Sequence, residues 1–125
     1  MTTNDGELDE ATLRSAEREL AAALASDDPT AWVHHYTEDA VFDAGDHAVE
    51  GRLALVEMAR SMRQLSDVSI RPLRTLGSGD LAAVWTEASW TSGEPPDRRS
   101  VQVRGVLVWR RDSDGRWRVA LEHIS

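Results

Sequence analysis

Two segments in the C-terminal half of the chain place groups that could do chemistry on alternating, strand-like patterns. Glu87 follows Trp85 on one face of residues 81–92, and His123 ends the more apolar face of residues 117–123. A carboxylate that loses solvent beside apolar groups has a raised pKa. Histidine changes charge close to neutral pH. If both side chains turn into an interior, Glu87 and His123 form an acid and a base for proton transfer.

Alternation along a strand defines two faces and leaves open which one is buried. The other face of residues 81–92 carries Ala82, Val84, Thr86, Ala88 and Trp90. If that face is inward, Glu87 is solvated. Arg104 is expected on the outer face, and only a bulge would turn it inward to pair with an inward Glu87 or an acidic ligand. A bulge in the last strand would likewise exchange His123 for Glu122. A lone histidine on an apolar face is also more often a core or rim residue.

Weaker candidates lie earlier in the chain. Asp43, Asp46 and His47 surround a glycine turn and could supply polar groups to a pocket, although turn chemistry accounts for Asp46 equally well. The hydroxyl of Tyr36 could donate a hydrogen bond to a ligand while its ring packs on Trp32, four residues earlier. Core packing with a locally satisfied hydroxyl is the competing interpretation of Tyr36.

Helical spacing fills the first half of the chain. Residues 9–25 repeat apolar side chains at intervals of three and four, which predicts a helix. Asp28 followed by Pro29 is typical of the start of a second helix, on which Trp32 would lie. A third helix is expected after Gly51. Its predicted inner face carries Leu55, Met58, Met62 and Leu65.

Strand patterns fill the second half. A short strand at 40–44 and its partner at 47–49 precede long strands at 68–76, 81–92, 99–111 and 116–124. Pro72 favours an edge strand or a bulge. Helices followed by a strand meander predict an α+β fold, with three N-terminal helices packed on a curved, mostly antiparallel sheet. Its concave apolar face would hold a small ligand.

Composition excludes several classes of function. The 125 residues are 41% hydrophobic and 29% charged, which suits a globular protein, and the net charge of −8 opposes nucleic-acid binding. The chain has no cysteine and no lysine, so thiol and Schiff-base catalysis are excluded. Adjacent His34 and His35 diverge on a helix, so no metal is expected. No cofactor, membrane span or signal peptide is expected, and the protein is predicted to be cytoplasmic.

Several stretches resemble a known family. The passage at residues 35–42, Gly51, residues 108–117 and the terminal residues 122–125 are similar to the nuclear transport factor 2-like superfamily. The resemblance covers roughly residues 8–125 as a single domain, preceded by a disordered tail at residues 1–7. It points to the SnoaL-like and ketosteroid-isomerase-like branch found in bacteria.

This resemblance implies a cone-shaped α+β barrel with a hydrophobic pocket, and frequent homodimers through the outer sheet face. It places Trp85 and Glu87 inward, and Trp90, Val106 and Val108 outward. The expected pocket residues are Trp32, Tyr36, Phe42, Met58, Met62, Trp85 and Leu107.

The isomerase residues of that branch can be compared position by position. The general base falls on Ala44 and the two oxyanion-hole positions fall on Leu20 and near Leu107, so none is retained. A slip of one residue would bring Asp43 to the base position but would turn it to the opposite face. Steroid isomerisation is therefore not expected. The expected function is binding of a small, mostly apolar molecule, with or without cofactor-free isomerase, cyclase or dehydratase chemistry. The alternative is a non-catalytic binding or dimeric association module.

Overall fold

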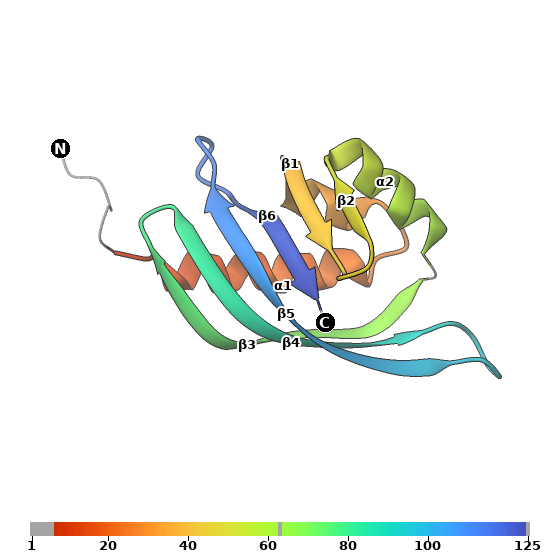
Figure 1. Ribbon diagram of the computed structural model, residues 1–125. Helices are drawn as coiled ribbons and strands as arrows, with labels where there is room; N and C mark the ends of the chain where they lie inside the picture. The colour runs from red at the N-terminus through yellow and green to blue at the C-terminus, as the bar shows by residue number, and fades with distance from the viewer. Residues whose placement is uncertain (1–6, 63, 125) are drawn as a thin grey trace.

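The structure is a computed structural model that describes residues 7–62 and 64–124 (Figure 1). The expected tail at residues 1–7 therefore lies outside the described residues, apart from Glu7. The helices are α1 (Glu10–Leu24), a 3-10 helix η1 (Ala31–His35) and α2 (Arg52–Ser61). The strands are β1 (Tyr36–Asp43), β2 (Ala48–Glu50), β3 (Leu65–Ser78), β4 (Leu81–Ser92), β5 (Arg99–Arg111) and β6 (Trp117–Ile124).

The first predicted helix is confirmed as α1. Its N-cap is Asp9, whose side chain accepts a hydrogen bond from the Thr12 amide at 3.2 Å. One side of α1 buries Leu13, Glu17 and Leu20. This face packs against the sheet, while the opposite side of α1 stays in solvent.

The expectation of three N-terminal helices is wrong, because the second one is only the five-residue 3-10 helix η1. Asp28 does not begin an α-helix: its carboxylate accepts bonds from the amide and the hydroxyl of Thr30, both at 2.9 Å, and so closes a local turn. Tyr36 is already extended, with φ −112° and ψ 151°. The expected contact between Trp32 and Tyr36 is nevertheless present, edge to face, with ring centroids 5.2 Å apart.

The third predicted helix, α2, is shorter than the apolar spacing suggested. Met62 is extended, with ψ 147°, and Leu65 begins β3. Met62 and Leu65 therefore approach the interior from the segment that leaves the helix rather than from its inner face.

The six strands form one sheet in the order β2-β1-β6-β5-β4-β3. The β1–β6 pair is parallel and the other pairs are antiparallel. Pro72 lies on β3, which is an edge strand, and the register also shifts between Pro72 and Arg74. Both readings of this proline are thus confirmed.

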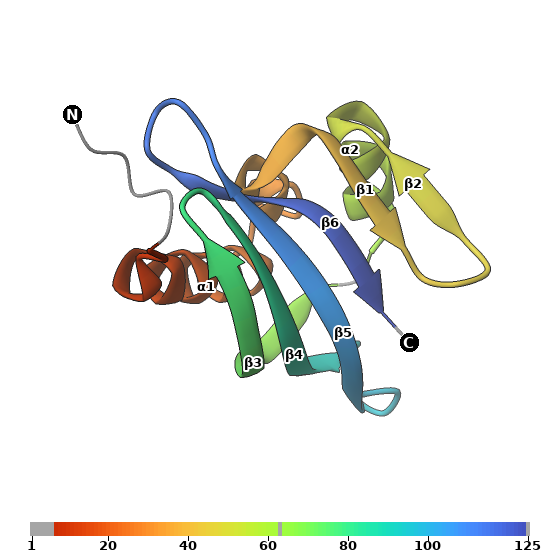
Figure 2. The same cartoon turned by 60° about the vertical axis from the view of Figure 1, so that its left-hand side comes forward.

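Both α-helices cover the same face of the curved sheet, while the β4–β5 hairpin projects beyond them (Figures 1 and 2). One core cluster joins α1 and α2 to that inner face. Its fully buried members include Leu13, Leu20, Leu55, Val84, Trp109 and Val119. No helix of the described residues covers the opposite, outer face of the sheet. None of the described helices is long and apolar enough to span a membrane.

Candidate functional site

A cavity of about 300 Å³ lies between the inner face of the sheet and the helices. The structure places six of the seven expected pocket residues on its wall: Trp32, Tyr36, Phe42, Met58, Met62 and Leu107. Most of the remaining wall is also apolar. The polar side-chain groups among the lining residues are the hydroxyls of Tyr36 and Thr86, the indole N–H groups of Trp32 and Trp90, and the carboxylate of Glu122.

Strand β4 presents the opposite face to the one implied by the resemblance. Thr86, Ala88 and Trp90 line the cavity, whereas Trp85 is 39% exposed on the outer face. Placing Trp85 and Glu87 inward, and Trp90 outward, is therefore wrong. The physical reason is that the set beginning with Ala82 and Val84 carries more apolar side chains, and its burial completes the core.

Glu87 is accordingly held in an ion-pair cluster outside the cavity. Its carboxylate bonds Arg71 of β3, and Arg104 of β5 lies 3.4 Å away. The hydrogen bond and charge of Arg71, followed by those of Arg104, lower the pKa of Glu87. A carboxylate that remains ionised and paired is unsuited to accepting and returning a proton near neutral pH.

A bulge in β6 decides which residue near the C-terminus enters the cavity. Trp109 pairs with Val119, but Val108 pairs with Leu121, so Ala120 is an extra residue in the ladder. From that point the alternation is inverted, and Glu122 lines the cavity wall. His123 lies on the outer face, and the expectation that it points inward is wrong.

His123 instead has a surface environment. Its Nδ1 lies 3.3 Å from the carboxylate of Asp43, its neighbour on β1, and both side chains are substantially exposed. Asp43 also accepts a bond from the Gly45 amide at 2.8 Å, which lowers its pKa. Asp46 and His47 are exposed in the same turn. This cluster therefore serves a turn at the strand ends and does not contribute to the cavity wall.

Glu122 and Tyr36 form the polar centre of the cavity. The Tyr36 hydroxyl donates a hydrogen bond to Oε1 of Glu122, and Tyr36 itself is 3% exposed. Burial raises the pKa of Glu122, and the bond from Tyr36 partly opposes that shift. Burial, reinforced by the Glu122 carboxylate, raises the pKa of Tyr36 as well. Tyr36 therefore remains a donor, and Glu122 can change its protonation state.

The sequence predicts only part of this pair. It indicates Tyr36 as a candidate ligand-binding residue, but it places Glu122 in the cavity only if β6 contains a bulge. One signal was available, since Ile124 shares the face of Glu122 and extends the apolar wall. Alternation continued without a bulge from Trp117 predicts instead that His123 faces inward.

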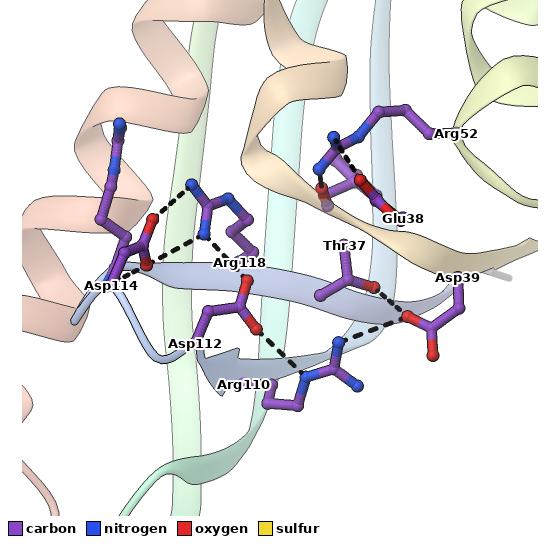
Figure 3. A network of polar contacts seen from close by, with 10 residues as sticks. Thr37, Glu38, Asp39, Arg52, Arg110, Asp112, Asp114 and Arg118 are labelled. Carbon is purple, nitrogen blue, oxygen red and sulfur yellow. Dashed lines mark hydrogen bonds and ion pairs between the residues drawn. The ribbon is translucent and has the colours of Figure 1, made fainter.

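A second polar cluster ties the sheet together away from the cavity (Figure 3). Arg110 lies 3.3 Å from both Asp39 and Asp112, and Arg118 bonds Asp112 at 2.8 Å and Asp114 at 2.9 Å. The hydrogen bond from Arg118 lowers the pKa of Asp114. Hydrogen bonds from Thr37 and Arg110 lower the pKa of Asp39. All these carboxylates are paired with arginine, so the cluster links β1 to β5 and links the turn between β5 and β6 to both of those strands.

No group of three or more potential metal-ligating side chains occurs within residues 7–62 and 64–124. Among the polar groups of the described cavity wall, the Glu122 carboxylate and the Tyr36 hydroxyl are the titratable pair. Such a pair can exchange a proton with a bound molecule and can position it by hydrogen bonding.

Comparison with known proteins agrees with this architecture. Similar solved structures include a protein with a cystatin-like fold from Nostoc punctiforme, with a TM-score of 0.77, 14% identity, and coverage of 94% of this chain and 92% of that one. A ketosteroid isomerase-like protein from Erwinia carotovora atroseptica has a TM-score of 0.76 and 21% identity over 92% and 93% of the two chains. A dehydratase candidate of the nuclear transport factor 2-like family from Streptomyces avermitilis has a TM-score of 0.75 and 18% identity over 94% and 95%.

These identities establish a shared fold and carry no residue roles. No curated protein matches the chain. The sequence profile described as the SnoaL-like domain matches residues 17–120, which include α2 and most of the sheet. The chain therefore belongs to the SnoaL-like domain family, with the fold of nuclear transport factor 2-like proteins.

Proposed function

We propose that the cavity binds a small, mostly apolar organic molecule and that Glu122 is its acid-base group, held in place by Tyr36. The observation that carries this proposal is a single carboxylate on an apolar wall, with a buried tyrosine hydroxyl on one of its oxygens. The proposal replaces Glu87 and His123, whose side chains lie outside the cavity.

The chemistry that fits this arrangement is proton transfer. A ligand bound against Glu122 would give up a proton from one of its atoms to the carboxylate, and the carboxylic acid so formed would return the proton to a second atom of the ligand. Tyr36 would stabilise the ionised form by hydrogen bonding and so bring the two protonation states closer in free energy. Isomerisation, cyclisation and dehydration need such steps, and the ketosteroid isomerase-like and dehydratase-like neighbours are consistent with that class.

Binding is tested first, with a neutral apolar dye such as Nile red and two matched variants. Ala88→Phe fills the cavity from β4, whereas Ser89→Phe adds the same group to the outer face of the same strand. We expect Ala88→Phe to abolish dye binding and Ser89→Phe to retain it. Equal binding by both variants would show that the dye binds elsewhere.

Catalysis is tested on the ligand that copurifies with the protein, identified by mass spectrometry. Glu122→Gln is expected to stop its turnover, and Glu87→Gln is expected to leave turnover unchanged. Binding without turnover in the wild type would make the protein a non-catalytic carrier with the same pocket.

We also propose that the protein forms a homodimer through the outer face of the sheet. An apolar row runs across five strands there, made by Leu76, Ala83, Val108, Leu121 and Val41. Leu76 is 51% exposed and Leu121 is 37% exposed, so large apolar side chains of one continuous row are left in solvent. Sheet-to-sheet packing with a second copy would bury this row.

A further inference from the structure

The charges of the cavity wall are strongly one-sided. Glu122 is the only carboxylate among the described residues that line the cavity, and no arginine or histidine lines it. The hydrogen bond from Tyr36 occupies Oε1 and brings no positive charge. By contrast, the carboxylates of Glu87 and Asp112 each lie against two arginines.

An unpaired carboxylate in an apolar cavity favours some ligands over others. A ligand anion would place two negative charges close together where little solvent screens them, and this is costly. A neutral ligand leaves the carboxylate without an opposite charge. A ligand ammonium supplies that charge and donates a charge-assisted hydrogen bond, which is stronger than a neutral one.

Aromatic side chains reinforce the preference for a cation. The rings of Trp32, Tyr36, Phe42 and Trp90 all contribute to the wall. Ring faces attract an ammonium group by cation–π interaction, while their bodies bury the apolar part of the ligand. The net charge of −8 would also raise the local concentration of cations around the protein.

We infer that the cavity selects hydrophobic amines: molecules with one ammonium group, which pairs with Glu122, and an aromatic or alicyclic body, which fills the apolar space. This inference rests on the proposed function, because it names the ligand class of the same cavity. It goes further in assigning Glu122 a binding role that depends on ligand charge.

The test uses three probes of nearly equal shape: naphthylmethylamine, naphthylmethanol and naphthoate. Their dissociation constants are measured by isothermal titration calorimetry for the wild type, Glu122→Gln, Ala88→Phe and Glu87→Gln. The Gln variants remove a carboxylate charge with little change of shape, one inside the cavity and one outside it. Naphthylmethanol binding also reports whether Glu122→Gln is folded.

We expect the wild type to bind the amine about tenfold or more tightly than the alcohol, and the naphthoate most weakly, since a bond to a charged group exceeds a neutral one by about that factor. Glu122→Gln should reduce the amine affinity to that of the alcohol and leave alcohol binding unchanged. Glu87→Gln should behave as wild type, and Ala88→Phe should lose all three probes.

Two results would overturn the inference while leaving the cavity as a binding site. One is alcohol binding equal to or tighter than amine binding in the wild type. The other is an amine affinity that Glu122→Gln does not change. If none of the three probes binds the wild type, both the amine preference and the proposed binding function are wrong.

Discussion

Removing the Tyr36 hydroxyl tests the geometry on which the site depends. Tyr36→Phe keeps the ring against Trp32 and removes only the donor to Glu122. A hydrogen bond to a charged group contributes about 1.5–3 kcal/mol to the free energy of unfolding. We expect Tyr36→Phe to cost that amount when Glu122 is ionised and less when Glu122 is protonated, because the bond to the charged form is the stronger one.

The pH dependence of this cost has a defined sign. Burial raises the pKa of Glu122 above its ordinary value of 4.5. The stability that its protonated form contributes is complete below 4.5 and is lost as pH rises through the folded-state pKa. The wild type should therefore lose stability relative to Glu122→Gln as pH rises, and Tyr36→Phe should lose more, because the bond from Tyr36 opposes the shift.

The assay is urea unfolding of the wild type, Tyr36→Phe, Glu122→Gln and the double variant, at about pH 4 and about pH 8. The double-mutant cycle isolates the coupling between the two side chains. We expect a coupling of about 1.5–3 kcal/mol at the higher pH that shrinks at the lower pH. A coupling near zero at both pH values, or one that grows on acidification, would refute the assignment of Glu122 as a buried carboxyl bonded to Tyr36.

Three further predictions concern the fold and the outer face. Leu13→Ala, at a fully buried position, should lower the free energy of unfolding by about 2–5 kcal/mol. Leu53→Ala, at a position that is 86% exposed, should change it by less than about 0.5 kcal/mol. Similar losses for the two variants in urea unfolding would contradict this packing. Trp85 is 39% exposed on the outer face of β4, next to Ala83 of the apolar row, so Trp85→Glu should convert a dimer into a monomer in sedimentation analysis and retain Nile red binding; an unchanged dimer mass would show that the interface does not include Trp85. Gly105→Ala should lower the melting temperature, because the added methyl group would collide with the backbone carbonyl of His123; an unchanged melting temperature would mean that β5 and β6 can separate there.

The sequence predicted those parts of the fold that depend on local patterns. The repeat of Leu13 and Leu20 specified α1, and Gly77–Asp80 and Asp112–Gly115 marked two of the hairpin turns. Pro72 located the edge strand. These features follow from helical periodicity, turn chemistry and a missing amide, which act within a few residues. The prediction of a second α-helix was wrong because Asp28 could cap either a helix or a turn. The path of the chain from α1 to β1 selects the turn.

The facing of the site residues was decided by the tertiary structure. Alternation sorted β4 into two sets that differ only modestly in apolar content, and the set that is buried is the one on the side from which α1 and α2 pack. In β6 the same alternation was locally correct up to Val119, and the extra residue Ala120 then exchanged His123 for Glu122. The extra residue lies where β6 pairs with both neighbours, and the β1–β6 register also shifts there, between the Tyr36–Val119 and Val41–Leu121 pairs. Local patterns in the chain thus specified α1 and the long strands, together with Trp32, Tyr36 and Phe42 of the cavity wall. The facing of β4 and the identity of the carboxylate on the cavity wall emerged only when six strands were assembled in register.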